Sequence, residues 1–119
     1  MNKRAVGSRY EDIAVDYLSK RGVKVITRNF RSRTGEIDIV GHDGEYYIFF
    51  EVKYRKNKDA GDPAEAVNPR KQYRISRVAD YFRVYRKLKD TDNVRFDVIS
   101  ILGGEVKWYK NAFFYVPSG

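Results

Sequence analysis

Two runs of alternating polar and apolar residues, 35–42 and 45–54, follow each other closely in the chain. A period of two along a run predicts a β-strand with one buried and one exposed face. The pair Asp43-Gly44 separates the runs, and an Asp-Gly pair in this position favours a hairpin closed by a two-residue turn. We therefore predict an antiparallel hairpin at the centre of the fold.

The predicted turn fixes which residues face each other across the hairpin. Counting back from it gives three pairs: His42 with Glu45, Asp38 with Phe49, and Glu36 with Glu51. Because side chains alternate between faces, one face carries the charged residues Glu36, Asp38, Glu51 and Lys53. The other face carries Ile37, Ile39, Ile48, Phe50 and Val52.

Three carboxylates on one face create an electrostatic conflict. Opposed side chains lie about 5 Å apart and diagonal ones about 7–8 Å apart, so Glu36, Asp38 and Glu51 repel one another. Mg²⁺ takes oxygen ligands from one or two carboxylates plus substrate phosphate, and Lys53 could contact the same phosphate or the attacking water. The pattern favours hydrolysis of a phosphodiester. The alternative is that Glu51 and Lys53 form an ordinary ion pair on a half-exposed strand.

A first helix is predicted over residues 8–21 and is stopped by Gly22. Its apolar residues recur at helical spacing: Tyr10, Ile13, Ala14, Tyr17 and Leu18. At helical spacing, Glu11 lies beside this apolar stripe. Ser8 and Glu11 also match a capping box, in which Glu11 would only bond the backbone at the helix start. Both interpretations of Glu11, as a cap and as a site residue, are open on spacing alone.

Further runs complete the order of elements. They are a strand over 23–30, an amphipathic helix over 70–89 started by Asn68-Pro69, a mostly apolar strand over 94–102, and a strand over 105–109. Asp62-Pro63-Ala64-Glu65 predicts a short helical turn before the long helix. The long helix can cross over and place strand 94–102 parallel to its neighbour. The predicted class is α/β, in the order α-β-β-β-α-β-β, with one domain over residues 1–119 and a helix on either face of a mixed sheet.

The apolar tail, Ala112-Phe113-Phe114-Tyr115-Val116, has two interpretations. It either packs onto the sheet as part of the core or forms an interface with a second subunit. We expect core packing first and keep the subunit interface as the alternative.

The composition excludes several kinds of chemistry. The chain has 119 residues and no cysteine, which excludes disulfides, thiol catalysis and thiolate zinc sites. Its one histidine, His42, falls beside the predicted turn, which argues against imidazole catalysis. We find neither the apolar region of a signal peptide nor a run as long as a membrane span, so we expect a cytoplasmic protein.

Positive charge is in excess along the chain. Lys plus Arg number 24 against 16 Asp plus Glu, which gives a net charge of +8. This excess favours nucleic acid or an anionic membrane surface as partner, and the acidic hairpin makes nucleic acid the first choice. The candidate phosphate contacts are Arg31 and Arg33 before the hairpin, Arg55, Lys56 and Lys58 after it, and Arg70, Lys71, Arg74 and Arg77 on the long helix. The alternative is that these cations are simply solvated.

Four short motifs together resemble a known family. They are Glu11-Asp12-Ile13-Ala14, Gly35-Glu36-Ile37-Asp38, Phe50-Glu51-Val52-Lys53 and Arg95-Phe96-Asp97-Val98. In this order they resemble the YraN family of small bacterial proteins, over roughly residues 7–101. That family is similar to the PD-(D/E)XK nuclease superfamily and close to the archaeal Holliday junction resolvases. The resemblance implies a restriction-endonuclease-like fold.

The resemblance also implies roles for individual residues. Asp38 and Glu51 would bind Mg²⁺, for which Mn²⁺ can substitute, and Lys53 would position or activate the attacking water. Glu11 would complete the site as a third metal ligand or as a water-holder, so the resemblance favours the site interpretation of this residue. Glu36 belongs to the family's Gly-Glu-Ile-Asp motif and is a secondary candidate.

The leading hypothesis is a Mg²⁺-dependent endonuclease-like phosphodiesterase that acts on DNA, including branched DNA such as Holliday junctions, as a homodimer. Such a protein would recognise the structure of DNA rather than its sequence. The alternative is a non-catalytic nucleic-acid-binding or adaptor protein that keeps the nuclease fold, whose binding would not respond to Mg²⁺. A small-molecule enzyme is disfavoured because the sequence has no glycine-rich phosphate loop.

Overall fold

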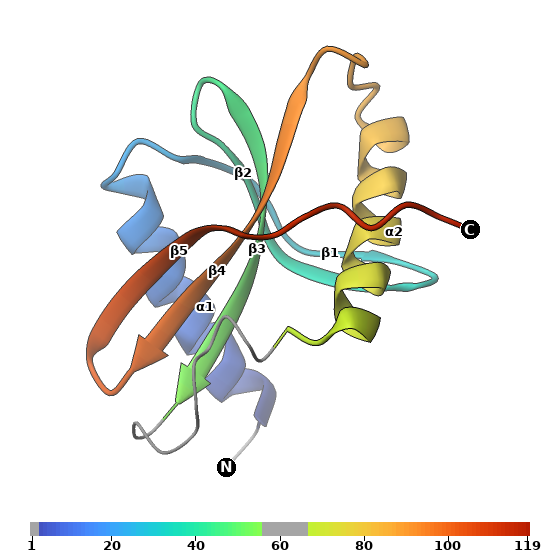
Figure 1. Ribbon diagram of the computed structural model, residues 1–119. Helices are drawn as coiled ribbons and strands as arrows, with labels where there is room; N and C mark the ends of the chain where they lie inside the picture. Colours follow the sequence, from blue (N-terminus) through green and yellow to red (C-terminus); the bar gives the residue numbers. More distant parts are fainter. Residues whose placement is uncertain (1–2, 56–66) are drawn as a thin grey trace.

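The computed structural model describes the backbone of residues 3–55 and 67–119, with side chains from residue 9 onward. Five strands form one sheet in the order β1-β2-β3-β4-β5, accompanied by two helices (Figure 1). The elements are α1 (Lys3–Ser19), β1 (Lys24–Ser32), β2 (Gly35–His42), β3 (Tyr46–Arg55), α2 (Pro69–Tyr85), β4 (Asn93–Leu102) and β5 (Glu105–Phe113). This order confirms the predicted nuclease-like α/β class. The predicted helical turn at Asp62-Pro63-Ala64-Glu65 lies outside the described residues.

Strand β3 is the centre of the sheet. It pairs antiparallel with β2 on one side and parallel with β4 on the other. The parallel pairing runs from Tyr46 with Asn93 to Arg55 with Leu102, and α2 lies between the two strands in the chain. A parallel neighbour needs a long crossover connection, and this is what made the mixed sheet predictable.

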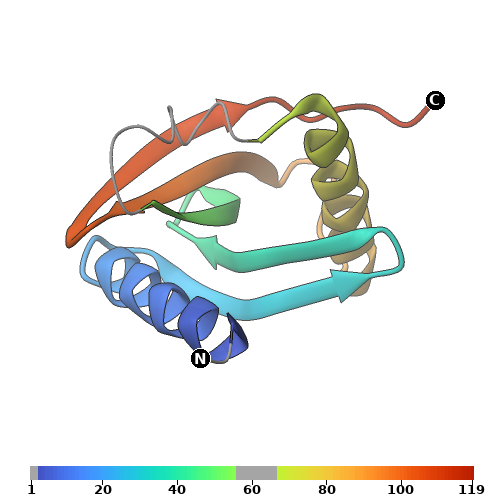
Figure 2. The ribbon, with the colours of Figure 1, turned by 90° about the horizontal axis from the view of Figure 1, so that it is seen from below.

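Two separate hydrophobic clusters cover the two faces of the sheet. On one face, α1 and the strands contribute Ala14, Leu18, Val23, Ile39, Ile48, Phe50, Ile99 and Ile101. On the other face, α2 and the strands contribute Ile37, Val40, Phe49, Ile75, Val78, Ala79, Phe82, Phe96 and Val98. Each helix therefore covers its own face, and α2 stands between the β1–β2 hairpin and the C-terminal segment (Figure 2).

The turn between β2 and β3 differs from the prediction. His42 pairs with Tyr47 and not with Glu45, so the turn is longer than two residues. The side chain of Asp43 explains the difference, because its Oδ1 accepts the backbone N–H groups of Glu45 at 2.9 Å and Tyr46 at 2.7 Å. Aspartate stabilises turns through such bonds to the backbone that follows it. The longer turn shifts the pairing of the two strands by two residues.

This shift changes the predicted pairs but does not by itself separate Asp38 from Glu51. Phe49 pairs with Val40 and not with Asp38, and the predicted pair of Glu36 with Glu51 is wrong for the same reason. Because side chains alternate with a period of two, a shift of two residues leaves Asp38 on the same side as Glu51. The corrected count places Asp38 level with Glu51.

Strand β2 bends at Asp38. Ile37 joins the cluster under α2, whereas Ile39 joins the cluster under α1. A regular strand would place both on one face, so the prediction that they share a face is wrong. Regular pairing with β3 ends at Ile39, and the Asp38 carboxylate replaces the ladder there by accepting the N–H of Val52. On β1, between the partners of Ile37 and Ile39, Asn29 has a left-handed backbone with φ of 53°.

Helix α2 begins where the sequence predicts. Asn68 is its N-cap, with Oδ1 accepting the N–H of Lys71 at 2.9 Å, and Pro69 is its first residue. It ends at Tyr85 and not at the predicted residue 89. Within residues 3–55 and 67–119, no helix has the length and apolar character needed to cross a membrane.

The apolar tail divides between core and surface. Phe113 is buried in the cluster under α2, while Phe114 is 76% exposed. The chain then crosses α2, where Val116 donates its N–H to Ser76 Oγ at 3.0 Å. Core packing is therefore confirmed for Phe113, and the segment after it is held on the outer side of the helix.

The Arg95-Phe96-Asp97-Val98 motif on β4 has a structural role. Asp97 is fully buried, and its carboxylate accepts hydrogen bonds from Arg95 at 2.9 Å, from Trp108 Nε1 at 2.8 Å and from the N–H of Asn111 at 2.8 Å. Arg95 also lies 3.8 Å from Asp43 in the β2–β3 turn. A buried charge is tolerated when it is saturated with donors in this way. The network joins β5 and the turn to β4.

Candidate active site

Two clefts meet at the bend of β2. The larger has a volume of about 460 Å³ and has α2 on one side; the smaller has a volume of about 230 Å³ and has α1 on one side. Asp38 and Glu51 line both clefts. Glu36 lines the larger cleft and Glu11 the smaller. The structure therefore gathers the four predicted acidic residues around one place.

Asp38 is held in position by the backbone of the next strand. Its Oδ2 accepts the N–H of Val52 at 2.8 Å. Burial, and after it the negative charge of Glu51, raises the pKa of Asp38 to about 7. Glu11 adds to the rise, while the hydrogen bond from Val52 and the charge of Lys71 oppose it. The fixed carboxylate thus sits where negative charge is disfavoured unless a cation is nearby.

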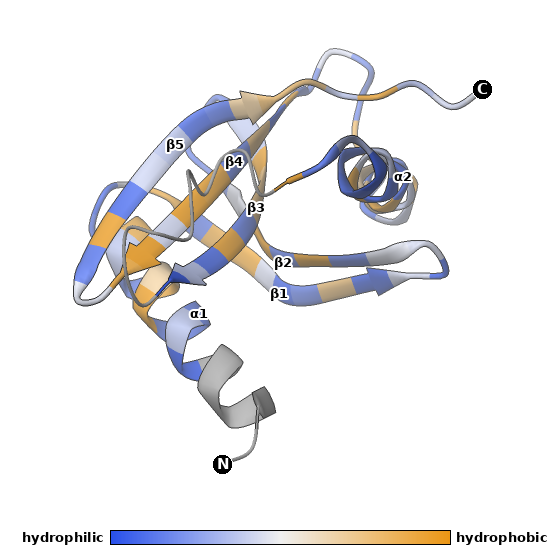
Figure 3. Ribbon diagram, turned by 60° about the horizontal axis from the view of Figure 1, so that its bottom comes forward, coloured by the Kyte–Doolittle hydropathy of each residue, from blue (hydrophilic) through white to orange (hydrophobic). Residues whose placement is uncertain are grey.

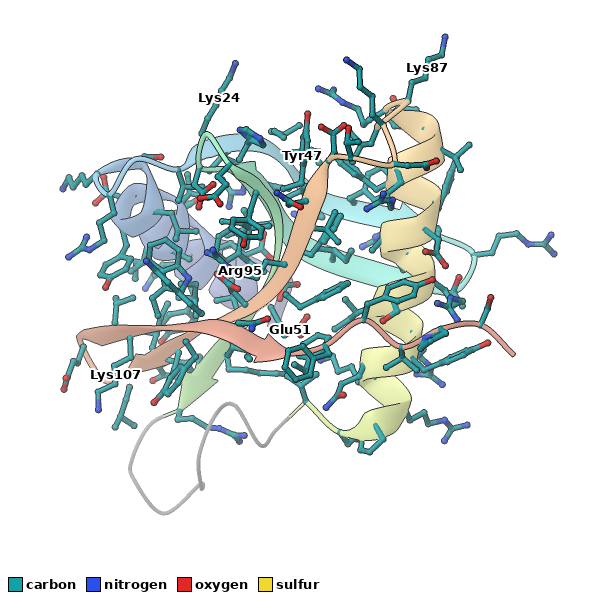
Figure 4. The ribbon with its side chains drawn as sticks, turned by 45° about the horizontal axis from the view of Figure 1, so that its top comes forward. Lys24, Tyr47, Glu51, Lys87, Arg95 and Lys107 are labelled. Carbon is teal, nitrogen blue, oxygen red and sulfur yellow. The ribbon has the colours of Figure 1, made fainter. Side chains whose placement is uncertain are left out.

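Glu51 is the most buried of the four acids, with 7% of its surface exposed. Its Oε1 lies 2.6 Å from Nζ of Lys71 and 3.4 Å from Nζ of Lys53. In Figure 4, Glu51 lies in the interior of the molecule, whereas the side chains of Lys24 and Lys87 extend outward at its edge. The carboxylate is therefore enclosed by protein and neutralised by two ammonium groups.

The pKa values of Lys53 and Lys71 depend on each other and on Glu51. Burial lowers the pKa of Lys53, as does the neighbouring Lys71, and Glu51 only partly offsets this. Burial alone would lower the pKa of Lys71 too, but the charge and hydrogen bond of Glu51 outweigh it and raise that pKa. Lys71 is thus the more strongly held cation of the pair, and Lys53 is the one whose proton is held less firmly.

Glu11 does not act as a helix cap. α1 begins at Lys3, so Ser8 and Glu11 both lie inside the helix and the capping-box interpretation is wrong. Glu11 Oε1 is buried without a hydrogen-bond partner, and Nη2 of Arg28 lies 3.7 Å from it. Arg28 makes its closer contact with Asp12, at 2.7 Å. Glu11 Oε1 therefore has the ion pair with Arg28 but no hydrogen-bond donor, and Glu11 lines the smaller cleft.

Glu36 is engaged with a cation of the neighbouring strand. Its Oε2 accepts from Nε of Arg31 at 3.0 Å, and both side chains are partly exposed. It lines the larger cleft on the side away from Glu11. Its role as a secondary site residue stays a prediction.

The donor set fits a divalent cation. Asp38 and Glu51 supply hard oxygen atoms, and Oε1 of Glu11, which lacks a hydrogen-bond donor, is an acceptor that a cation or its bound water would satisfy. In the described part of the chain, no three His, Cys, Asp or Glu side chains come close enough together to hold one ion directly. Mg²⁺ commonly uses only one or two carboxylates and keeps several waters. Asp38 and Glu51 would therefore be the two protein ligands of such an ion, and Glu11 would act through water.

Several of the predicted phosphate contacts lie at the larger cleft. Arg70, Lys71 and Arg74 line it from the N-terminal half of α2. Arg31 and Arg33 are exposed at the end of the β1–β2 hairpin, next to Thr34, which also lines the cleft. Arg55 ends β3, and Lys56 and Lys58 lie outside the described residues. The basic surface therefore borders the acidic residues.

Arg77 is placed differently from the other predicted contacts. Its side chain is only 12% exposed, and Nε lies 3.0 Å from Asp80. Its Nη2 donates to the hydroxyl of Tyr115 at 2.9 Å and to the carbonyl of Val116. The guanidinium thus holds the C-terminal segment on α2, and we withdraw Arg77 as a phosphate contact.

Residues 10–101 match the model of uncharacterised protein family UPF0102. The chain belongs to this family. The resemblance to the YraN family, which is UPF0102, is thereby confirmed. The matched span includes Glu11, Asp38, Glu51 and Lys53.

Relatives cover nearly the whole chain. A UPF0102 protein of Lachnoclostridium phytofermentans is 43% identical over 113 residues, which is 95% of this chain and 96% of that protein. A UPF0102 protein of Fusobacterium nucleatum subsp. nucleatum is 42% identical over 111 residues, or 93% of this chain and 92% of that protein. A UPF0102 protein of Caldicellulosiruptor bescii is 45% identical over 101 residues, or 85% of each chain. Their names state the family and no activity.

The sequence did not reveal two aromatic residues at the site of this UPF0102 chain. Tyr10 and Tyr54 stack with ring centroids 3.9 Å apart and an interplanar angle of 17°, and both line the smaller cleft. Tyr10 belongs to the apolar stripe of α1, so the helical periodicity alone predicts that it is a core residue. The sequence offered one signal for them: Tyr10 directly precedes the candidate site residue Glu11, and Tyr54 directly follows the candidate site residue Lys53.

Proposed function

We propose that the protein is a Mg²⁺-dependent endonuclease-like phosphodiesterase that acts on DNA. One observation carries the proposal: Asp38 and Glu51 line two meeting clefts, and burial with mutual repulsion raises the pKa of Asp38 to about 7. Such a pair is stabilised by a divalent cation. Perturbed carboxylates in a cleft are typical of functional sites.

Each residue of the site has a chemical role in this proposal. Asp38 and Glu51 would hold the ion, and Glu11 would hold a water molecule through Oε1, which has no hydrogen-bond donor in the protein. When bound, Mg²⁺ would polarise the scissile phosphate and lower the pKa of its water. Lys53 Nζ, at 3.4 Å from Glu51, would orient the attacking water and offset charge that develops on the phosphate.

The surroundings of the site support DNA as the substrate. Arg70 and Arg74 line the larger cleft, where they would contact the backbone without reading sequence. The net charge of +8 supplies long-range attraction for a polyanion. We further propose that the substrate is branched DNA, that the protein acts as a homodimer, and that it works in the cytoplasm; these parts rest on the family resemblance and on the sequence.

Cleavage assays test the proposal directly. Linear, flapped, nicked and four-way DNA would be incubated with Mg²⁺, Mn²⁺ or EDTA, using the parent protein and the variants Asp38→Ala, Glu51→Ala and Lys53→Ala. We expect cleavage that requires a metal and is lost at least about a hundredfold in each variant. Glu105→Ala, a change of an exposed acid at the start of β5, is the matched control and should cleave as the parent does. Equal cleavage by the parent and by the three site variants would refute the assignment.

A non-catalytic nucleic-acid-binding protein is the second candidate, and one contact favours it. Lys71 and Lys53 already neutralise Glu51, so the site has an internal substitute for a metal charge. Titration of the protein with MnCl₂ in a calorimeter separates the two candidates. Heat that disappears in Asp38→Ala supports the nuclease, whereas no heat, together with DNA binding that EDTA does not change, supports the binding protein.

A further inference from the structure

A second groove adjoins the candidate active site. It has a volume of about 480 Å³ and is lined by Arg31, Ser32, Arg33, Thr34 and Tyr81. Thr34 also lines the larger cleft that contains Asp38 and Glu51. The two hollows therefore meet at the end of the β1–β2 hairpin, and a ligand that leaves the larger cleft past Thr34 enters this groove.

The groove has an aromatic wall supplied by α2. Tyr81 is 46% exposed although it is a large aromatic residue. Its ring packs edge-on against Phe30, with centroids 5.7 Å apart, and Phe30 in turn packs edge-on against the buried Phe82 at 5.2 Å. Tyr81 is therefore held by Phe30 and by an edge-on contact with Tyr85 at 6.3 Å, while nearly half of its surface stays accessible. A fixed, accessible ring is the feature on which a nucleobase stacks.

The groove also has a cationic wall supplied by β1 and its turn. Arg31 and Arg33 are both exposed, and Arg31 is oriented by its 3.0 Å bond to Glu36. The last residues of β1 are hydrophilic (Figure 3). On α2, Arg74 and Tyr81 are seven residues apart, which places them on the same side of the helix about 10 Å apart. Arginine side chains are therefore found both in the larger cleft and in the groove beside Tyr81.

We propose that this groove binds a single-stranded segment of nucleic acid that continues from the backbone in the active-site cleft. A base stacks on Tyr81, while Arg31 and Arg33 contact the flanking phosphates. A base inside a duplex has both faces covered by its neighbours, so it cannot stack on a protein ring without leaving the helix. The inference rests on the proposed function and narrows its substrate class to nucleic acids with a single-stranded arm at the scissile bond.

Binding measurements in EDTA test the groove without any cleavage. Fluorescence anisotropy would compare a labelled single strand of about 20 nucleotides with a blunt duplex of the same length. Tyr81→Ala should weaken binding of the single strand about fivefold to a hundredfold and that of the duplex less than about twofold. Tyr81→Phe, which keeps the ring, should bind the single strand as the parent does.

Two further variants keep the test decisive. Tyr81→Leu keeps apolar packing against Phe30 but has no aromatic ring, so it should lose single-strand binding as Tyr81→Ala does even if the alanine variant folds poorly. Phe114→Ala removes an exposed aromatic residue of the C-terminal segment and should change nothing. Parent-like binding by Tyr81→Leu, or an equal loss for single strand and duplex, would overturn the inference.

The outcome is separable from that of the proposed function. A parent protein that cleaves DNA but binds single strands independently of Tyr81 overturns the groove and leaves the nuclease standing. A parent protein that never cleaves but loses single-strand binding in Tyr81→Leu supports the groove and overturns the nuclease.

Discussion

Asp38 accepts a hydrogen bond that fixes its carboxylate in a place where a negative charge is unfavourable. It accepts the N–H of Val52 where β2 leaves β3, and this fixes its carboxylate beside Glu51. The same placement raises its pKa to about 7, so the folded protein disfavours the charged form. A carboxylate whose charge destabilises the folded protein is expected where that charge is used to bind a cation.

The first prediction concerns the pH dependence of stability without metal. The pKa of Asp38 rises from its ordinary value of 3.8 to about 7 on folding, so its destabilising effect is absent below pH 4, grows between pH 4 and 7, and is complete above pH 7. Asp38→Asn removes the charge and keeps an oxygen acceptor for Val52. We expect the free energy of unfolding at pH 8 to rise by about 1–3 kcal/mol in EDTA, with a smaller gain at pH 5.

Urea unfolding at the two pH values measures this effect. Asp90→Asn changes an exposed aspartate in the connection between α2 and β4 and should leave stability unchanged at both. A gain of the same size at pH 5 and pH 8, or no gain at pH 8, would contradict the account of Asp38.

The second prediction concerns Lys71 and the metal. Its Nζ lies 2.6 Å from Glu51 Oε1, so it would have to release this oxygen when an ion binds there. Lys71→Met should therefore tighten Mn²⁺ or Mg²⁺ binding by roughly threefold to tenfold, the effect of removing about 1 kcal/mol of competition from a partly exposed pair. Calorimetric titration measures the dissociation constant.

Arg70→Met is the matched control for Lys71→Met, because Arg70 lines the same cleft from the neighbouring position. It should change metal affinity by less than about twofold. Weaker metal binding in Lys71→Met would mean that the lysine supports the metal site instead of competing with the ion.

The residues of the candidate site were predictable from sequence because their types and alternation are local properties. Asp38, Glu51 and Lys53 are read directly from the polar positions of two strands. The contact of Lys71 with Glu51 joins residues 20 positions apart through the start of α2, and the sequence predicted Lys71 only as a phosphate contact on the long helix. Tyr81 was not predicted at all, because its position is consistent with the core and only packing reveals its exposed face.

At the level of elements, the hairpin shows what a periodic pattern can and cannot predict. The pattern predicts two strands and their faces, and a register error of two residues left the faces of Asp38 and Glu51 unchanged. The error came from the side chain of Asp43, whose bonds to Glu45 and Tyr46 make a longer turn. The bend at Asp38 was invisible in the pattern, because period-two counting assumes a regular strand.

The third prediction tests the backbone beside this bend. Asn29 has φ of 53° and an exposed side chain, so a substitution there acts mainly through the backbone. Asn29→Val should lower the free energy of unfolding by about 1–2 kcal/mol, because branched side chains disfavour the left-handed region. Asn29→Gly should change it by less than about 0.5 kcal/mol.

Chemical denaturation of both variants measures the difference. Lys24→Val, at an exposed position of the same strand where φ is negative, controls for a general effect of valine on β1. If Asn29→Val were as stable as Lys24→Val, the left-handed residue would not be needed for the bend.

At the level of the whole molecule, the fold class followed from the order of elements, and the two faces followed from amphipathic helices. What sequence could not provide was the position of charges relative to one another. Arg74 and Arg77 are three residues apart on one helix, yet Arg74 lines the active-site cleft and Arg77 binds the C-terminal segment. A net charge of +8 therefore overstates the number of cations available to a phosphate backbone.

The fourth prediction uses this pair to map the nucleic-acid surface. Each phosphate contact adds close to one unit to the slope of log affinity against log salt concentration, because it releases bound counterions. Arg74→Met should lower the slope for duplex DNA by about 1 and weaken binding. Arg77→Met should leave the slope unchanged and instead lower the free energy of unfolding by about 1–2 kcal/mol, since Tyr115 and Val116 lose their donor. Anisotropy titrations over a range of salt concentrations, paired with urea unfolding, measure both quantities. An equal drop in slope for the two variants would show that the C-terminal segment leaves α2 when DNA binds.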